Sequence, residues 1–235
     1  MSTPSSHPSI TFPARLRHQL IVSCQAPPGD PLDHPEVLRR LALSALRGGA
    51  GGLRANGAET IRSFRAETEL SILGIHKRYR GHRSEITPDF ASAVAIAQAG
   101  ADVIALDCTT ARAADTEPWP ELVSRIHHEL ARPVLADVAT VAEARSAEAA
   151  GADAVATTLY GYTPETEGQR SVNWPMVEEL ACTLRVPLLV EGHIRNPEDL
   201  RRAFELGAYA VVVGAAIARP ESITAQFVHH IPPGF

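Results

Sequence analysis

A Gly-Ala pair recurs along this chain of 235 residues, and its spacing limits the fold more than any other feature of the sequence. The four pairs start at Gly49, Gly100, Gly151 and Gly207, so successive glycines are 51, 51 and 56 residues apart. Each pair follows a segment of helical periodicity and precedes an apolar run. Glycine is favoured at a helix end because the residue there often adopts the left-handed backbone conformation. One strand–loop–helix–loop unit takes about 25 residues, so each interval contains two such units.

Eight short apolar runs agree with this count. We expect β-strands at Leu20–Ser23, Gly52–Arg54, Ile72–Ile75, Val103–Leu106, Val134–Ala136, Ala154–Thr157, Leu188–Val190 and Ala210–Val213. Apolar residues at three- and four-residue spacing predict helices between the strands. These helices are expected at Pro35–Leu46, Pro88–Ala99, Pro120–Leu130, Val141–Ala150, Pro175–Leu184 and Pro197–Leu206. Several start with proline, which is well tolerated in the first turn of a helix.

Eight alternating units without a break in composition predict a single-domain α/β protein, a closed (β/α)8 TIM barrel. The barrel is expected to span residues 20–235, and residues 1–19 to form a flexible tail with a short lead-in helix near Arg15–Gln19. The alternative fold is an open, doubly wound sheet. Such a sheet favours a Gly-x-Gly-x-x-Gly motif after the first strand, and this chain has none there.

The composition argues against several classes of protein. A formal net charge of −5 disfavours a nucleic-acid-binding surface. No apolar run approaches the ~18 residues that a membrane-spanning helix needs. The three cysteines, Cys24, Cys108 and Cys182, show neither a disulfide nor a zinc pattern, which fits a reducing compartment such as the cytoplasm. The acidic residues show no metal-ligand spacing, so we expect neither a metal nor a cofactor.

The two ends of the predicted strands differ in character. The amino ends carry Gly-Ala pairs or a proline, whereas the carboxyl ends carry polar residues or glycine. In chain order the carboxyl-end residues are Ser23, Gln25, Arg54, Asn56, Lys77, Arg78, Asp107, Thr109, Asp137, Thr157, Thr158, Tyr162, Glu191 and Gly214. Active sites of such barrels lie at the carboxyl ends of the strands. Any single residue of this set could instead form a structural ion pair, but that explanation is weak for the whole set.

Two of these residues suggest proton transfer. Glu191 ends the apolar run of the seventh strand, and Lys77 follows the run of the third strand. The third and seventh strands lie roughly opposite each other in an eight-stranded barrel. We therefore expect Lys77 and Glu191 to face each other across the barrel mouth, as an acid and a base that serve opposite faces of one carbon should.

The last two strands suggest a phosphate site. Gly192 follows the seventh strand, and Gly214 and Ala215 follow the eighth. In (β/α)8 barrels the loops after strands 7 and 8, together with a short helix, commonly bind phosphate through backbone N–H groups. Small residues suffice for such a site because the backbone makes the contacts. The structural alternative is that Gly214 only turns the chain.

At these residues the chain resembles the N-acetylmannosamine-6-phosphate 2-epimerase family. The resemblance covers about residues 20 to 228 in unbroken order. The segments that carry it are Leu20–Ala26, Leu53–Gly57, Gly74–Arg78, Ile104–Asp107, Ala136–Asp137, Thr157–Thr163, Glu191–Gly192, Ala210–Gly214 and Ala218–Pro220. The first two, Leu-Ile-Val-Ser-Cys-Gln-Ala and Leu-Arg-Ala-Asn-Gly, are more restricted than the short Gly-Ala-Asp matches found in many phosphate-binding barrels.

The resemblance implies a (β/α)8 enzyme that interconverts N-acetylmannosamine 6-phosphate and N-acetylglucosamine 6-phosphate in sialic-acid breakdown. It implies that Lys77 and Glu191 are the catalytic acid/base pair. It places Gln25, Arg54, Asp137 and Arg219 around them as substrate-binding or orienting groups, and we add Thr158 to this group. The partner is then a small phosphosugar rather than a nucleic acid or a membrane, and a homodimer is left open.

Three departures from the family pattern stand out. Ala215 occupies a position where the family often has Ser, so a hydroxyl contact to phosphate is missing. Tyr160 stands where Ser is usual, and His76 and His193 replace residues that vary. None of these positions belongs to the expected acid/base pair, so the departures affect phosphate affinity and specificity rather than activity.

Epimerisation at C2 requires that a proton leave one face of the carbon and return to the other. The C2 hydrogen is acidic only beside a carbonyl, so the sugar must react as the open-chain aldehyde. The resulting enolate needs a positive group near O1, for which Arg54 is a candidate. Two alternatives use the same residues: a Schiff-base aldolase or lyase with Lys77 as nucleophile, and a non-catalytic phosphosugar-binding barrel.

Overall fold

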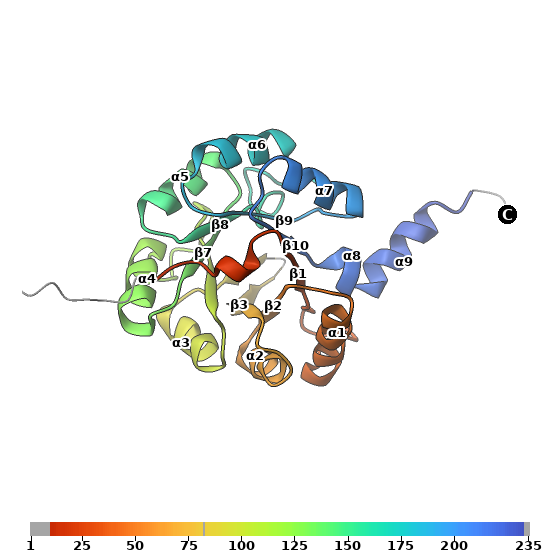
Figure 1. Ribbon diagram of the computed structural model, residues 1–235, viewed down its shortest axis with the longest axis horizontal. Coiled ribbons are helices and arrows are strands. Elements are labelled where there is room, and N and C mark those ends of the chain that lie inside the picture. The colour runs from red at the N-terminus through yellow and green to blue at the C-terminus, as the bar shows by residue number, and fades with distance from the viewer. Residues whose placement is uncertain (1–9, 82, 233–235) are drawn as a thin grey trace, which may run out of the picture.

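The computed structural model describes residues 10–81 and 83–232, and it shows a closed barrel of eight parallel strands (Figure 1). Around the barrel the strand order is β1-β10-β9-β8-β7-β6-β3-β2. The barrel strands are β1 (Leu20–Ser23), β2 (Gly52–Asn56), β3 (Ser71–Ile75), β6 (Val103–Asp107), β7 (Val134–Asp137), β8 (Ala154–Ala156), β9 (Leu188–Glu191) and β10 (Ala210–Val213). The sequence prediction of a (β/α)8 barrel is confirmed, and all eight expected strands are present.

Most of the helices surround the barrel on the outside, and the last one extends away from it. They are α1 (Pro35–Arg47), α2 (Ala58–Arg65), α3 (Phe90–Gln98), α4 (Trp119–Arg125), α5 (Val141–Ala149), α6 (Trp174–Thr183), α7 (Pro197–Glu205), α8 (Ala215–Ala218) and α9 (Pro220–His229). A π-helical turn, Ile126–Leu130, continues α4. The six helices predicted from periodicity are all present, whereas α2, α8 and α9 were not predicted.

The Gly-Ala repeat has the expected structural role. Gly49, Gly100, Gly151 and Gly207 all have positive φ angles, between 95° and 105°. Each glycine ends the helical layer of one unit and leads into β2, β6, β8 or β10. These are the second, fourth, sixth and eighth barrel strands, as the spacing predicts.

The side chains of the strands alternate between two cores. Along β3, Leu73 and Ile75 belong to the core inside the barrel, while Ile72 packs in the core between the barrel and the helices. This alternation follows from the two-residue period of a strand. Phe12 and Leu16 close the barrel interior at one end, and Ile86 belongs to the same interior cluster.

The lead-in segment differs in detail from the expectation. The predicted helix near Arg15–Gln19 is a single 3-10 turn, Ala14–Leu16. Phe12, within the predicted tail, is buried and packs edge-to-face on Tyr209 with ring centroids 5.9 Å apart. Residues 1–9, the rest of the predicted flexible tail, lie outside the described residues.

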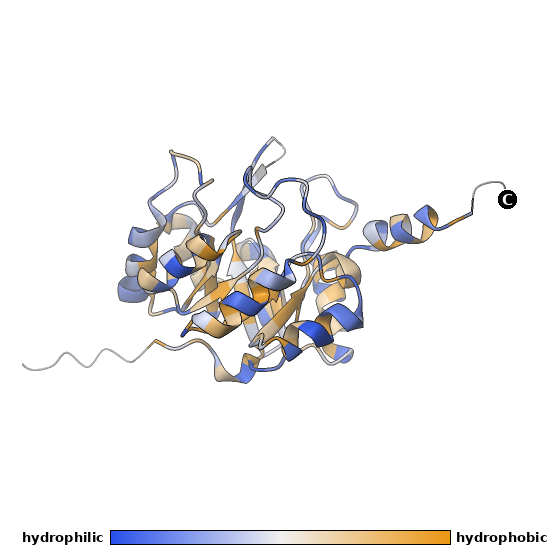
Figure 2. Ribbon diagram, turned by 90° about the horizontal axis from the view of Figure 1, so that it is seen from above, coloured by the Kyte–Doolittle hydropathy of each residue, from blue (hydrophilic) through white to orange (hydrophobic). Residues whose placement is uncertain are grey.

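A hairpin that the sequence did not predict changes the setting of Lys77. The third barrel strand ends at Ile75, and Lys77 is the first residue of β4 (Lys77–Arg80), which pairs antiparallel with β5 (Arg83–Ile86). Lys77 therefore lies at the base of a two-stranded extension above the barrel, rather than on the barrel strand itself. The hairpin rises from the same side of the molecule as the other long loops (Figure 2).

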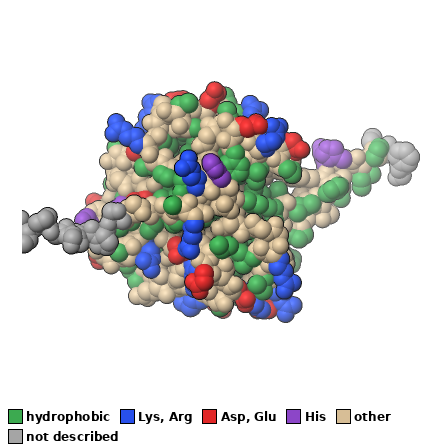
Figure 3. All heavy atoms as spheres, in the orientation of Figure 1, with side chains coloured by type: hydrophobic (Ala, Val, Ile, Leu, Met, Phe, Trp, Pro, Cys, Tyr) green, Lys and Arg blue, Asp and Glu red, His purple; other side chains and the backbone are tan. Residues whose placement is uncertain are grey.

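The opposite end of the barrel is covered by the lead-in segment, which lies in front of the strands in Figure 1. On this face the basic and acidic side chains are intermixed and do not gather by sign (Figure 3). No helix of the described residues is long and apolar enough to cross a membrane.

Candidate active site

A cavity of about 620 Å³ opens at the carboxyl ends of the barrel strands. It brings together all of the predicted site residues except Arg54 and Asp137. Those that line it are Gln25, Lys77, Thr158, Glu191, Gly192, Gly214, Ala215 and Arg219. The volume falls in the range of small-molecule sites, which is roughly 300–1,000 Å³. Lys77, at the base of the hairpin after the third barrel strand, and Glu191, at the end of the seventh, thus face one cavity.

Arg54 and Asp137 lie beneath the cavity, fully buried at 0% exposure. Arg54 projects from β2 and forms a two-pronged ion pair with Asp137 of β7, with 3.0 Å between Nη1 and Oδ1. The Nη1 group of Arg54 also donates to Glu191 of β9. One guanidinium therefore holds two carboxylates from strands on the far side of the barrel.

Thr158 completes this cluster from the loop after β8. Its hydroxyl lies 3.1 Å from Glu191 Oε2 and 3.3 Å from Arg54 Nη1, and it also contacts Asp137. A hydroxyl can accept from the guanidinium and donate to one carboxylate at a time. We infer that Thr158 fixes the geometry of the two carboxylates around Arg54.

The cluster determines which charges the cavity contains. Burial acts to lower the pKa of Arg54, but Asp137 and Glu191 outweigh it and raise that pKa, so Arg54 stays cationic. The pKa of Glu191 is raised, because burial penalises its charged form more than Arg54 stabilises it. A carboxyl group with a raised pKa can carry a proton near neutral pH.

The pKa of Lys77 is shifted in the opposite direction. Burial lowers the pKa of its ammonium group, and the positive charge of Arg54 lowers it further. Glu191 and Asp137 oppose this shift, but the net direction is downward. A lysine with a lowered pKa has a larger neutral fraction and can act as a base. The pKa values of the two predicted partners are therefore shifted in opposite directions, downward for the amine and upward for the carboxyl group.

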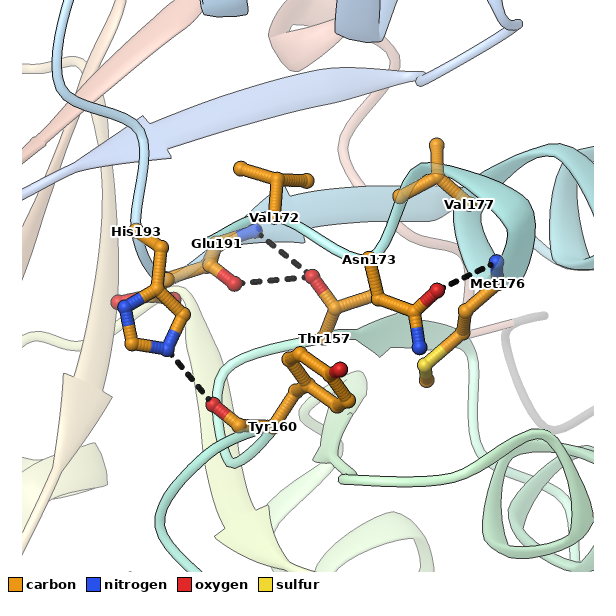
Figure 4. A pocket seen from close by; sticks show the side chains of 9 residues that line it. Thr157, Tyr160, Val172, Asn173, Met176, Val177, Glu191 and His193 are labelled. Atoms are coloured by element: carbon orange, nitrogen blue, oxygen red, sulfur yellow. Dashed lines mark hydrogen bonds between the residues drawn. The ribbon is translucent and has the colours of Figure 1, made fainter. Parts of the chain in front are cut away.

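The backbone of Glu191 is held from behind, as Figure 4 shows. The hydroxyl of Thr157 lies 3.1 Å from the N–H of Glu191 and 2.9 Å from its carbonyl oxygen. A cavity of about 10 Å³ adjoins this contact, lined in part by Asn173, Met176 and His193. Its volume is about that of one water, far smaller than the larger cavity that Glu191 also lines.

Gln25 and Arg219 line the cavity, but each also has a partner within the protein. Gln25 donates to Ser23 at 2.8 Å, and its Oε1 is buried without a hydrogen-bond partner among the described residues. Arg219 forms an ion pair of 2.8 Å with Asp30, a nearly buried carboxylate. Asp30 therefore offsets part of the positive charge that Arg219 brings to the cavity.

The three residues predicted to bind phosphate lie together at the end of the barrel. Gly192 follows Glu191 with a φ of 95°, a conformation that favours glycine. Gly214 is the residue before the four-residue helix α8, and Ala215 is its first residue. All three line the cavity, as the fold-based prediction requires.

Other lining residues were not selected from the sequence. Asp107 is one of them: its Oδ1 accepts two hydrogen bonds from Thr109, at 2.8 and 2.7 Å. Burial raises its pKa. The remaining ones come from the hairpin, the loops after β8 and β9, and α9; they include Ser84, Ile86, Tyr162, Arg170, His193, Arg195, Ser222 and Gln226. Among the lining residues, Ser23, Asp107 and Tyr162 had a signal in the sequence, which was their position at or just after the end of a predicted strand.

The unusual residues Tyr160 and His193 contact each other. His193 adopts a positive φ of 60°, and its Nε2 donates to the carbonyl oxygen of Tyr160 at 3.0 Å. Its ring stacks on Tyr162, with centroids 5.5 Å apart and planes 7° apart. These contacts join the loop after β8 to the loop after β9 beside Glu191.

No group of three His, Cys, Asp or Glu side chains in residues 10–81 and 83–232 is arranged to hold a metal ion.

Comparison with known proteins gives a consistent family. Residues 38–232 match the family described as "Putative N-acetylmannosamine-6-phosphate epimerase". A protein of Clostridium perfringens (strain SM101), described as "Putative N-acetylmannosamine-6-phosphate 2-epimerase", is 40% identical over 213 residues, which cover 90% of this chain and 96% of the relative. A protein of Thermosynechococcus vestitus with the same description is 43% identical over 215 residues, covering 91% and 93%.

Solved structures agree. The N-acetylmannosamine-6-phosphate 2-epimerase from Clostridium perfringens superposes with a TM-score of 0.88 at 37% identity, covering 98% of this chain and all of that one. Thiamine phosphate pyrophosphorylase from Pyrococcus furiosus superposes with a TM-score of 0.61 at 16% identity, covering 91% and 93%. The second likeness concerns the fold alone.

The buried cluster leads to a stability prediction. We expect Arg54→Leu to lower the free energy of unfolding by about 3–5 kcal/mol, because it leaves the Asp137 and Glu191 carboxylates buried without their cation. The double variant Arg54→Leu, Asp137→Leu should lose less, since it removes the fully buried carboxylate as well. Urea denaturation followed by circular dichroism measures both. A double variant less stable than Arg54→Leu would contradict this account of the cluster.

Proposed function

The chain belongs to the N-acetylmannosamine-6-phosphate 2-epimerase family, and on that premise we propose that Lys77 and Glu191 transfer the C2 proton of N-acetylmannosamine 6-phosphate. The observation that carries the proposal is that these two side chains line one cavity. The pKa of Lys77 is lowered there and that of Glu191 is raised. The reaction interconverts that sugar and N-acetylglucosamine 6-phosphate. The Schiff-base alternative and the non-catalytic alternative are not favoured by the family.

The chemistry starts from the open-chain aldehyde. Neutral Lys77 takes the proton from C2, the electrons move into the C1 carbonyl, and an enolate forms. Protonated Glu191 then gives a proton to the opposite face of C2, which inverts the carbon. In the reverse direction the two groups exchange roles, as microscopic reversibility requires.

Arg54 supports these steps from below the cavity. The sequence suggested it as the donor to the enolate oxygen, yet its Nη1 and Nη2 groups are occupied by Asp137 and Glu191. We propose that Arg54 acts through its charge instead. It favours the neutral amine of Lys77, and its positive potential stabilises the negative charge that develops on the substrate.

The phosphate of the substrate is assigned to the loops after β9 and β10. Gly192, Gly214 and Ala215 offer backbone N–H groups there, and Arg219 adds positive charge that Asp30 partly offsets. Gln25 and Thr158 face the same cavity and are proposed to orient the sugar.

We place the protein in the cytoplasm, as the cysteine pattern predicts. Cys24, Cys108 and Cys182 are free thiols. A reducing compartment keeps such thiols from pairing.

We also propose that the functional unit is a dimer of this chain. The helix α9 extends away from the barrel in Figures 1 and 2, and none of its described residues is buried. Phe227 and Val228 are 76% and 58% exposed, and Ile231 beyond the helix is 62% exposed. A second copy of this chain can cover these apolar side chains symmetrically.

Exchange of the C2 hydrogen with solvent is the direct consequence of the mechanism. In D₂O, each epimerised molecule should carry deuterium at C2, measured by NMR. The variant Glu191→Gln should still exchange the C2 hydrogen for deuterium in the epimer whose C2 hydrogen faces Lys77. Inversion at C2 should slow about 10²–10⁴-fold, because the acid on the opposite face is gone. Epimerisation without label would exclude proton transfer, and normal inversion in Glu191→Gln would remove Glu191 from the mechanism.

The base role of Lys77 predicts a defined pH dependence. Only the neutral amine accepts a proton, so kcat/KM should rise with pH through the pKa of Lys77, which lies below the ordinary value of 10.5. Lys77→Arg should lose about 10²–10⁴-fold in kcat at every pH, because a guanidinium keeps its proton although the charge is retained. Steady-state rates between pH 6 and 10 test this. Near-normal turnover by Lys77→Arg would refute the base role.

The dimer predicts a clear response to charge on α9. Phe227→Asp should shift the protein from dimer to monomer, measured by light scattering at several protein concentrations. Ser146→Asp, on the exposed side of α5, is the matched control and should leave the assembly unchanged. A parent protein that is monomeric at all concentrations, or a Phe227→Asp variant that stays dimeric, would disprove this proposal.

A further inference from the structure

The position of Lys77 is not fixed by the pairing of the barrel strands. The parallel register between β2 and β3 ends where Asn56 pairs with Ile75, and Lys77 lies two residues farther on. From there the chain leaves the barrel in the β4–β5 hairpin. Other contacts must therefore hold the backbone of Lys77 at the cavity.

Asn56, the last residue of β2, makes such a contact. Its side-chain Oδ1 accepts the backbone N–H of Lys77 at 2.8 Å. The next residue, Gly57, donates its N–H to the carbonyl oxygen of Ile75, also at 2.8 Å. The Asn56 side chain thus continues the tie between the second and third units past the last pair of the barrel ladder.

The opposite side of the hairpin base is tied separately. Thr87, which is fully buried, donates its N–H to the carbonyl oxygen of His76 at 2.7 Å, and its hydroxyl accepts the N–H of His76 at 3.3 Å. The same hydroxyl donates to Ala105 of β6 at 2.6 Å. Thr87 thus joins residue 76 to the fourth barrel strand, and Asn56 joins residue 77 to the second.

We propose that Asn56 is a positioning residue for Lys77, whose amide oxygen fixes the lysine backbone so that the amine reaches C2 of the bound sugar. This inference rests on the proposed role of Lys77 as the base. A lysine side chain is a flexible four-carbon stem. Its amine can therefore be placed reproducibly only if the backbone that carries it is held in position. A displacement of about 1 Å in a reacting group can cost about 10²-fold in rate.

The absence of charge on the asparagine side chain is part of this role, because a charge at position 56 would act on the pKa of Lys77. The charged groups that act on Lys77 are Arg54 of β2, Glu191 of β9, Asp137 of β7 and Arg219 after α8. Their balance, together with burial, leaves the pKa of the lysine lowered. Aspartate at position 56 would accept the same hydrogen bond, but its negative charge would favour the ammonium form. Asparagine supplies the acceptor without adding that charge.

Two substitutions separate position from charge. Asn56→Ala removes the acceptor, and we expect kcat to fall at least tenfold with KM and the pH profile little changed. Asn56→Asp keeps the acceptor and adds charge. It should retain kcat within about threefold at high pH. The acidic limb of its pH–rate profile should shift to higher pH by about half a unit or more, because the added negative charge raises the pKa of Lys77.

Asn196→Ala is the matched control. Its Oδ1 also accepts a backbone N–H at 2.8 Å, from Asp199 at the start of α7, but it does not contact Lys77. We expect this variant to lose some thermal stability and to keep its pH profile and its kcat within about twofold. Thermal melts of all three variants establish that each is folded at the assay temperature.

The outcomes distinguish this inference from the proposed function. If Lys77→Arg is inactive but Asn56→Ala turns over within twofold of the parent, the positioning role is wrong and the base role stands. If Asn56→Asp is as slow as Asn56→Ala at high pH, the retained acceptor does not rescue the rate, and the positioning role is also wrong. If Lys77→Arg remains active, the proposed function itself fails.

Discussion

The active-site end of the barrel depends on one buried cation. Arg54 is fully enclosed and joins β2 to Asp137 of β7 and Glu191 of β9. Burying a guanidinium costs several kcal/mol unless carboxylates compensate it, and the same holds for each carboxylate. The three groups therefore stabilise one another, and they tie together three strands across the barrel interior, no two of which are neighbours. Together with burial, the same charges shift the pKa values of Lys77 and Glu191, so stability and chemistry share one interaction.

The barrel itself could be predicted because its signals are local and repeated. Gly49, Gly100, Gly151 and Gly207 mark helix ends by a backbone conformation that other residues adopt with strain. The carboxyl-end rule then placed Lys77, Glu191 and most of their neighbours around one cavity. The hairpin after β3 was missed because its strands are short and rich in charge, Lys77–Arg80 and Arg83–Ile86, and so lack the apolar alternation by which strands are recognised.

The orientation of individual side chains could not be predicted. Arg54 was expected at the substrate, but β2 extends to Asn56 and the Arg54 side chain is enclosed beneath the cavity floor. Arg219 was expected among the substrate-binding groups, and it pairs with Asp30 from a loop almost 190 residues away in the chain. Both outcomes depend on long-range pairing of charges. Residue spacing carries no information about such pairing, whereas burial and complementary charge decide it.

Two residues of β2 control Lys77 in different ways. Arg54 contributes charge and no direct contact with Lys77 among the described hydrogen bonds, whereas Asn56, two residues later, contributes a contact and no charge. Residues two apart on a strand project from the same face. One strand therefore supplies both controls on the lysine, electrostatic and geometric, from separate side chains. A charged anchor at position 56 would combine the two and would oppose the neutral amine that the chemistry requires.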